Sequence, residues 1–177
     1  MVEKPYVVVS GPPASGKSTL APRLAQGLGL PLLAKDTVKD AMMSRFTVPD
    51  VEASRQFGRA AVAVMLAVAA QSPIGAVIES NFSRSKAVTD LLALPGHVVE
   101  VFCRCRREVA WARYAARAGT RGPGHFDHDS RPDELWNGEV AEPVAGPWPV
   151  IEVNTEEPVD VAAVLVAVRA AMVGSPT

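Results

Sequence analysis

The sequence predicts an α/β protein in which helices cover both faces of a five-stranded parallel sheet. Strand-length segments rich in β-branched residues alternate with helical segments along the chain. These strand segments are apolar throughout, as is typical of parallel strands buried on both faces. The chain has 177 residues, 48% of them hydrophobic, which is enough for one domain with a sizeable core. We therefore expect a single domain over residues 1–177, built as a three-layer α/β/α sandwich.

Two strand–helix units open the chain. Residues 6–10, YVVVS, predict a buried strand, and residues 17–28 predict the helix that follows it. The segment LPLLAK, residues 30–35, predicts a short second strand. Residues 36–46 predict a helix with Asp36 at its N-cap, because an aspartate oxygen accepts hydrogen bonds from the first free N–H groups of a helix.

The middle of the chain continues this alternation. Residues 51–71 predict a long helix, whose apolar part AAVAVMLAVAA would span about 16 Å, roughly half of a bilayer core. We therefore expect a buried helix there and no membrane span. Residues 75–80 and 97–105 predict the third and fourth strands, and residues 84–94 and 107–118 predict the helices that follow them.

Residues 119–148 break the alternation, with many Gly, Pro, His and Asp residues and few apolar ones. Irregular segments of this length are usually functional, so we expect a lid here. Trp136 and Trp148, near its end, either stack on a ring of a ligand or close the core. Residues 149–154 then predict the fifth strand, and residues 158–172 predict a closing amphipathic helix.

Composition narrows the class of function. The formal net charge of −1 argues against a protein that mainly binds nucleic acid, because such binding depends on neutralising many phosphates. The N-terminal residues lack the pattern of a signal peptide, which favours a reducing cytoplasm as the location. We expect a monomer or a homodimer with no membrane association.

The loop after the first strand carries the strongest motif. Gly11, Gly16, Lys17 and Ser18 fit G-x-x-x-x-G-K-[ST] between a predicted strand and a predicted helix. In this arrangement backbone N–H groups and the helix dipole converge on an anion, and the lysine reaches the β- and γ-phosphates. The motif therefore predicts ATP binding. The expected nucleotide-binding residues are Gly11, Ala14, Ser15, Gly16, Lys17, Ser18 and Thr19.

Acidic residues follow the second and third strands, at the edge where the carboxyl ends of parallel strands meet. Asp36 is placed to orient and deprotonate an acceptor hydroxyl, although it also fits a purely capping role. Glu79 is placed to hold Mg²⁺ together with Ser18 or to orient the acceptor; the alternative is an exposed strand end. Asn81 follows two residues later. We expect Asp36, Glu79 and Asn81 to face the acceptor.

Cationic side chains complete the predicted site. Arg113, Arg117 and Arg121 recur at intervals of four, and either turn toward the γ-phosphate or form a solvated face. We assign Arg117 and Arg121 to catalysis with Lys17 and Asp36, and Arg113 to the nucleotide. Near the start of the long predicted helix, Arg55 and Arg59 either line the acceptor pocket or stay exposed. The residues expected to bind the acceptor are Asp36, Lys39, Arg59, Glu79 and Asn81.

Taken in order, these segments resemble the P-loop small-molecule kinases around chloramphenicol phosphotransferase, zeta-type toxins and the kinase domain of polynucleotide 5′-kinases. The matching segments are GPPASGKST, KDTVKD, VIESNFSR and RYAARAGTRGPGH, and VIEVNTEEPVDVA is similar to the segment beside the adenine. The resemblance implies the strand order 2-3-1-4-5, Mg-ATP as phosphate donor and Asp36 as the catalytic base. It also implies that Asn154 and Thr155 lie near the adenine ring of ATP. The chain departs from the family pattern at Glu79, where many relatives carry Asp, and at Gly122, where some carry His.

Three functions fit these features. The first is an ATP-dependent phosphotransferase that acts on a hydroxyl of a small molecule. The second is a polynucleotide or nucleoside 5′-kinase, which a near-neutral charge supports poorly and which steep salt dependence would favour. The third is a nucleotide-binding switch or ATPase without a small-molecule acceptor, for which Asp36 and the spaced arginines would be superfluous.

Overall fold

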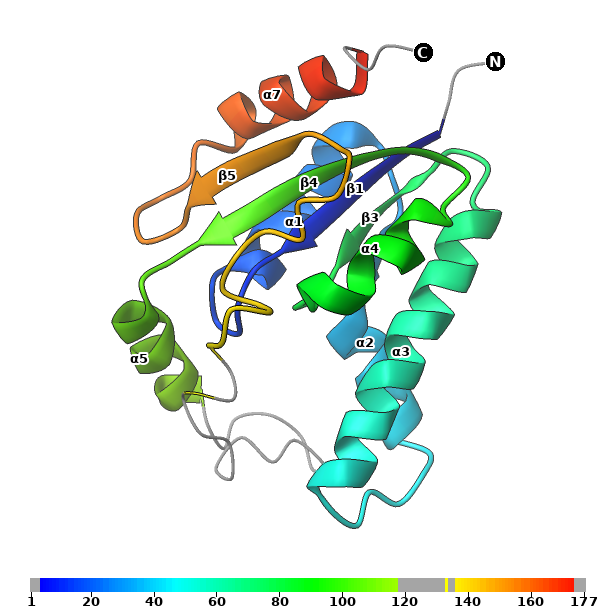
Figure 1. Ribbon diagram of the computed structural model, residues 1–177, viewed down its shortest axis with the longest axis vertical. Coiled ribbons are helices and arrows are strands. Elements are labelled where there is room, and N and C mark those ends of the chain that lie inside the picture. Colours follow the sequence, from blue (N-terminus) through cyan, green and yellow to red (C-terminus); the bar gives the residue numbers. More distant parts are fainter. Residues whose placement is uncertain (1–3, 118–132, 134–135, 174–177) are drawn as a thin grey trace.

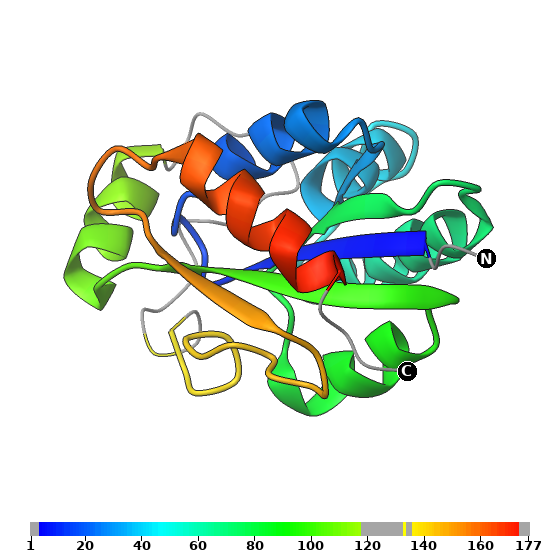
Figure 2. The ribbon, with the colours of Figure 1, turned by 90° about the horizontal axis from the view of Figure 1, so that it is seen from above.

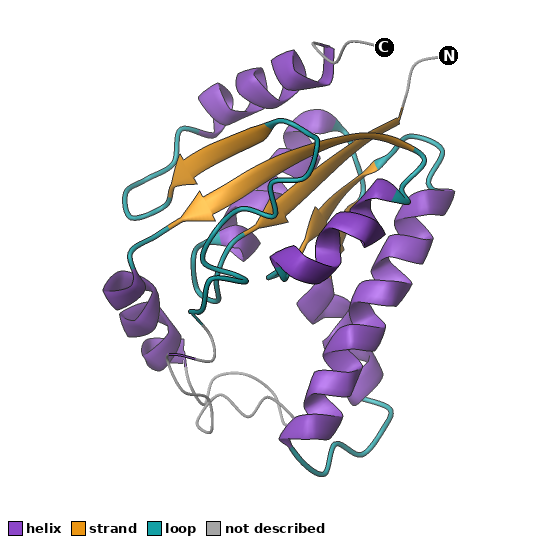
Figure 3. Ribbon diagram, viewed as in Figure 1, coloured by secondary structure: helices purple, strands orange, loops and turns teal. Residues whose placement is uncertain are grey.

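The computed structural model, which describes residues 4–117, 133 and 136–173, contains a five-stranded parallel sheet between two layers of helices (Figure 1). All strand arrows point toward the same edge of the sheet (Figure 3). The strand order is β2-β3-β1-β4-β5, which confirms the predicted fold and strand order. The strands are β1 (Lys4–Ser10), β2 (Leu32–Ala34), β3 (Ala76–Glu79), β4 (Gly96–Arg104) and β5 (Val150–Asn154).

The helices cover the sheet on both faces. Helices α1 and α7 pack on one face and α3 and α4 on the other, and Figure 2 shows α1 and α7 across the sheet from α4. The helices are α1 (Lys17–Leu28), α2 (Lys35–Met43), α3 (Val51–Gln71), α4 (Arg84–Leu92), α5 (Arg107–Arg117) and α7 (Val161–Val173). None of the helices within the described ranges combines the length and hydropathy needed to cross a membrane.

The central strand explains why the predicted strands are apolar throughout. Val7 and Val9 of β1 pack toward α1 and α7, whereas Tyr6 and Val8 pack toward α3 and α4. All four side chains are fully buried. Burying one valine side chain contributes about 1.5–3 kcal/mol relative to leaving it exposed. Because two helix layers flank β1, both of its faces require apolar residues.

The start of α2 corrects one prediction. The helix begins at Lys35, and its N-cap is Ala34, which has extended backbone and no side-chain cap. Strand β2 runs directly into α2 without a loop, so Asp36 lies in the first helical turn and its predicted N-cap role is wrong. A carboxylate in that turn is still favoured by the helix dipole. Asp50 caps α3 instead, where its Oδ1 accepts a hydrogen bond of 2.8 Å from the N–H of Ala53.

Residues 136–148 of the predicted lid form no strand or α-helix and pack against the rest of the protein. Trp148 and Val144 lie in the core cluster on the α3–α4 face. Trp136 packs edge-on against Trp111 and Tyr114 of α5, with ring centroids 5.7 and 5.8 Å away. Both tryptophans are therefore buried in the protein. The predictions for Arg121 and Gly122 lie outside the described residues.

Candidate active site

The phosphate-binding loop occupies residues 11–16, between β1 and α1. Its backbone has positive φ at Gly11 (136°), Ala14 (61°) and Gly16 (91°), and Gly16 is the N-cap of α1. A Cβ on Gly11 would lie 2.7 Å from the carbonyl oxygen of Cys103, and one on Gly16 would lie 3.3 Å from Cβ of Thr155. The two glycines are therefore required by backbone conformation and by close packing against β4 and the segment after β5.

Lys17 is the first residue of α1, and its side chain folds back to the phosphate-binding loop. Its side chain is buried, at 7% exposure, and Nζ donates a 2.7 Å hydrogen bond to the carbonyl oxygen of Pro12. Burial lowers the pKa of Lys17 to about 8, and the nearby charge of Glu79 opposes this shift. Ser15 Oγ is also buried and has no hydrogen-bond partner within the described residues. A buried ammonium at the first turn of a helix is suited to bind an anion.

Glu79 ends β3 next to the first turn of α1. It is 5% exposed, so the alternative of an exposed strand end is wrong. Ser18 Oγ donates to Glu79 Oε2 across 3.5 Å. Burial raises the pKa of Glu79, while the ammonium of Lys17 lowers it. Carboxylate and hydroxyl oxygens are ligands that Mg²⁺ prefers, so Ser18 and Glu79 fit a magnesium site in chemistry and in proximity.

Asp36 faces the same cavity from the first turn of α2. Its carboxylate is 3.0 Å from Lys35 Nζ, and that ammonium also donates a 2.8 Å hydrogen bond to Asn81 Oδ1. Lys35 thus joins the first turn of α2 to the segment after β3. Asp36 lines the cavity and keeps 40% of its side chain exposed.

The cavity has a volume of about 1220 Å³ and lies at the carboxyl edge of the sheet. This volume exceeds the roughly 300–1,000 Å³ of a typical small-ligand pocket, so it leaves room for two ligands. The structure brings to it most of the sequence-predicted site residues that it describes: Ala14, Gly16, Lys17, Ser18, Thr19, Asp36, Lys39, Arg59, Glu79, Asn81, Arg113, Arg117 and Thr155. Gly11, Ser15 and Asn154 do not line it.

Two predicted acceptor residues come from neighbouring helices. Lys39 of α2 donates a 2.7 Å hydrogen bond to Ser54 Oγ of α3, a residue that is itself buried. Arg59 lies on the cavity side of α3 and forms a 2.7 Å ion pair with Glu52. Arg55 also lines the cavity. Arg55 and Arg59 therefore line the cavity and are also exposed, so the two alternatives predicted for them are both met.

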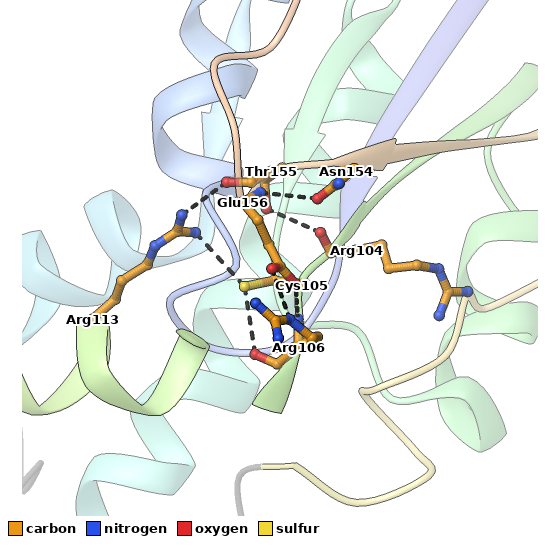
Figure 4. Close-up of polar contacts among 7 residues, drawn as sticks. All are labelled: Arg104, Cys105, Arg106, Arg113, Asn154, Thr155 and Glu156. Carbon is orange, nitrogen blue, oxygen red and sulfur yellow. Dashed lines mark hydrogen bonds and ion pairs between the residues drawn. The ribbon is translucent and has the colours of Figure 1, made fainter. Parts of the chain in front are cut away.

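Arg113 of α5 contacts protein groups around the P-loop (Figure 4). Its Nη2 donates a 2.9 Å hydrogen bond to the carbonyl oxygen of Thr155, and Nη1 lies 3.7 Å from Cys105 Sγ. Thr155 Oγ1 in turn lies 2.6 Å from the carbonyl oxygen of Ser15. Arg113 therefore links α5 to the P-loop through the segment after β5.

Asn154 and Arg117, the remaining predicted residues on this side of the site, make local contacts. Asn154 Oδ1 accepts a 3.0 Å hydrogen bond from the N–H of Glu156, which shapes the turn after β5 (Figure 4). Arg117 lies over the ring of Tyr114, with its guanidinium carbon 5.2 Å from the ring centroid, and lines the cavity.

Sequence reasoning missed several residues that the structure places at the site. Lys86 and Asp90 of α4 and Glu157 after β5 line the cavity, although nothing in their local pattern distinguishes them from surface charges. Glu100, which is buried and does not line the cavity, was also missed, because it lies in the middle of β4 rather than at its end. The carboxylate flanked by valines in HVVEVF was a signal, because a charged group in a buried strand needs buried hydrogen-bond donors around it.

The strand order, the phosphate-binding loop and the position of the cavity together define a P-loop kinase fold. Among solved structures, a candidate kinase from Chloroflexus aurantiacus J-10-fl is 29% identical, with 96% of each chain covered and a TM-score of 0.82. A gluconokinase from Sinorhizobium meliloti 1021 is 19% identical, covering 98% of this chain and 94% of its own, with a TM-score of 0.62. A shikimate kinase from Acinetobacter baumannii in complex with shikimate is 19% identical, covering 96% and 93%, with a TM-score of 0.59.

The chain belongs to the AAA domain family, whose profile matches residues 7–135. That range contains the P-loop, Asp36, Glu79 and α5. The gluconokinase and shikimate kinase similarities show a shared fold alone, because identity is low. No curated protein matches the chain. The narrower resemblance to the chloramphenicol phosphotransferase, zeta toxin and polynucleotide kinase group stays a prediction.

Proposed function

We propose that the protein is an ATP-dependent phosphotransferase that moves the γ-phosphate of Mg-ATP to a hydroxyl of a small molecule. One observation carries this proposal: Lys17 and Ser18 of the P-loop share a single cavity with Glu79 and Asp36. A loop suited to phosphates, a carboxylate beside its serine and a second accessible carboxylate are the parts that phosphoryl transfer needs. The kinase fold of the structural neighbours supports the same class.

The nucleotide would lie with its phosphates on the P-loop and its base toward Thr155. Lys17 would exchange the carbonyl of Pro12 for phosphate oxygens and stay buried. Thr19 lines the cavity one residue beyond the predicted metal ligand Ser18. Arg117, with Arg121 from the lid, would stabilise charge that develops on the transferred group.

Ser18 and Glu79 would hold Mg²⁺, which when bound neutralises charge on the phosphate oxygens. Glu79 suits this role because its carboxylate is buried and, among the described residues, accepts a single long hydrogen bond, from Ser18. Without a counter-ion such a group is unfavourable. Lys17 supplies part of the compensation in the free protein.

Asp36 would accept the proton of the acceptor hydroxyl as its oxygen attacks the γ-phosphorus and the bond to the β–γ bridging oxygen breaks. Lys35 and Asn81 fix the carboxylate beside the cavity. Lys39 and Arg59 would bind the rest of the acceptor. We further propose that the chain is one P-loop kinase domain, monomeric or homodimeric, in which residues 119–148 act as a lid that excludes water.

The direct test is transfer of label from γ-labelled ATP to a broad panel of hydroxyl compounds, with the Lys17→Ala protein as the blank. We expect labelled product with at least one small molecule and none with the variant. Labelling only of oligonucleotide or nucleoside 5′ ends would favour the 5′-kinase reading. Release of inorganic phosphate without any labelled product, at a rate unaffected by the panel, would contradict the proposal and favour an ATPase or switch.

A further inference from the structure

The cavity concentrates positive charge in a chain that is nearly neutral. Among the described residues, nine Lys and Arg residues line the cavity, against four Asp and Glu residues, whereas the full sequence has 18 Lys and Arg and 19 Asp and Glu residues. The formal charge of the whole protein is −1. The cavity therefore attracts anions more strongly than the rest of this nearly neutral protein does.

Only part of this charge faces the expected nucleotide. Lys17 and Arg23 belong to α1, and Arg113 and Arg117 belong to α5, which is tied to the segment after β5 by Arg113. The other five cations come from α2, α3 and α4. We call them the acceptor wall: Lys35, Lys39, Arg55, Arg59 and Lys86.

Topology separates the acceptor wall from the nucleotide side. In the order β2-β3-β1-β4-β5, the P-loop follows the central strand, α2 follows β2, and α5 follows β4. Figures 1 and 2 show α5 at the opposite side of the domain from α2 and α3. A nucleotide on the P-loop with its base toward Thr155 would leave the acceptor wall facing the second ligand.

Four cations of the acceptor wall form two pairs, each spaced by about one helical turn. Lys35 and Lys39 are four residues apart on α2, and Arg55 and Arg59 are four residues apart on α3, so each pair shares one helix face. The Lys39–Ser54 hydrogen bond of 2.7 Å joins the two helices. Like charges at this spacing destabilise a helix by a few tenths of a kcal/mol, so the pattern has a cost that an anionic ligand would offset.

Among the described residues, three acids line this side of the cavity: Asp36, Glu79 and Asp90. Five cations of the acceptor wall therefore face three carboxylates, of which Asp36 lies 3.0 Å from Lys35. In the proposed function Glu79 also holds the metal ion, so positive charge stays in excess on this side. Glu52, the ion-pair partner of Arg59, does not line the cavity, and that pair is more than half exposed on both sides. Such exposed pairs are weak and readily exchange for a ligand.

We infer that the acceptor is a small hydroxylated anion, whose carboxylate or phosphate group binds the acceptor wall while its hydroxyl faces Asp36. This inference rests on the proposed function for the identity of the second ligand. Guanidinium groups such as those of Arg55 and Arg59 match both anions because they donate two parallel hydrogen bonds. A polynucleotide is the poorer fit, because these cations line one cavity of a protein whose net charge is −1.

The test compares charged compounds with neutral compounds of similar shape. Binding to the protein loaded with a nonhydrolysable ATP analogue and Mg²⁺ would be measured by calorimetry for gluconate against glucose, and for glycerate and glycerol 3-phosphate against glycerol. We expect at least one anion to bind tenfold or more tightly than its neutral partner. The first two anions report a carboxylate site, and the third reports a phosphate site.

Variants assign the effect to the wall. Arg55→Gln/Arg59→Gln and, separately, Lys86→Gln should each reduce the anion preference, the double variant by tenfold or more. Arg45→Gln removes the same charge from an exposed residue that does not line the cavity, and should keep the preference. Unfolding midpoints would verify that each variant is folded.

The outcomes separate the two proposals. Neutral members that bind as well as the anions, absence of binding by all three anions, or a preference that the wall variants do not change would overturn the anionic acceptor. Oligonucleotide binding in place of these anions would overturn it as well. Anion binding that depends on the wall, without any phosphate transfer, would support the inference and count against the proposed phosphotransferase.

Discussion

Lys17 shows at the scale of one residue how a functional charge is held inside a folded protein. Its ammonium is buried among the groups of the P-loop, with the carbonyl of Pro12 as its hydrogen-bond partner. Burial disfavours the charged form, which lowers its pKa to about 8 from an ordinary value of 10.5. A bound phosphate would reverse this, because a nearby negative charge favours the ammonium.

This leads to a pH dependence of nucleotide binding. Below about pH 8 Lys17 is already charged in the free protein, so this group should make the dissociation constant for ADP depend little on pH. Above that pH the free protein loses the proton that the complex retains, and the dissociation constant should rise about tenfold per pH unit. Calorimetry in buffers of different ionisation enthalpy should detect proton uptake on binding near pH 8.5. Proton release, or affinity that is constant up to pH 10, would contradict the assignment.

Asp36 is the second residue on which the mechanism depends. Asp36→Asn keeps the shape of the side chain but removes the proton acceptor, and general-base catalysis contributes about 10²–10⁴ in rate. We expect kcat to fall by about a hundredfold or more, with the dissociation constant for ATP nearly unchanged. Asp40→Asn, on the same helix but outside the cavity, is the matched control and should retain turnover. A parallel loss of ATP affinity would assign Asp36 a structural role.

At the scale of elements, a buried carboxylate joins β4 to the end of the predicted lid segment. Glu100 is 0% exposed, and its Oε1 accepts hydrogen bonds from Ser10 Oγ (2.6 Å) and the N–H of Val144 (2.8 Å). Its Oε2 accepts from the N–H of Ala145 (2.9 Å) and from Trp148 Nε1 (3.2 Å). Four donors therefore surround one buried carboxylate, and they come from the end of β1, just before the P-loop, and from the end of the lid segment.

Glu100→Gln should test this junction. The amide keeps the volume but directs N–H groups at donors, so we expect a loss of about 2–4 kcal/mol in unfolding free energy. Glu152→Gln removes a carboxylate that is half exposed in its pair with Arg104, and should cost at most about 1 kcal/mol. Urea denaturation, followed by tryptophan fluorescence to which Trp148 contributes, measures both variants. Equal stabilities for the two variants would show that the network around Glu100 contributes little.

The same junction marks the limit of sequence-based prediction. The strands and helices were predictable because burial on both faces leaves a continuous apolar signal, and the P-loop because its motif is local. The partners of Glu100 lie 44–48 residues further along the chain or 90 before it, and no local pattern encodes such contacts. Asp36 failed as an N-cap for a related reason: the absence of a loop between β2 and α2 is set by the sheet.

At the scale of the whole molecule, the sheet places the P-loop between two groups of side chains. Strand β1 is central, so the loop that follows it has α5 and the segment after β5 on one side and α2, α3 and α4 on the other. Sequence order alone could place Asp36 and Glu79 at the edge of the sheet. It could not show that α2 and α3 pack so that Lys39 and Arg59 face the same cavity, because helix–helix packing depends on side chains far apart in the chain.

Ligand-linked stability tests this arrangement in one measurement. A ligand that binds only the folded state at a hundred times its dissociation constant adds about 2.7 kcal/mol, which for a chain of this size raises Tm by about 5–10 °C. We expect this shift for wild-type protein with ADP and Mg²⁺, and a smaller one at the same ADP concentration with EDTA. Glu79→Gln should bind ADP but lose most of the difference between Mg²⁺ and EDTA, because the buried carboxylate beside Ser18 is gone. Lys17→Ala should lose the shift under both conditions. If Glu79→Gln retains the full wild-type response to Mg²⁺, the metal is held elsewhere and the role proposed for Glu79 is wrong.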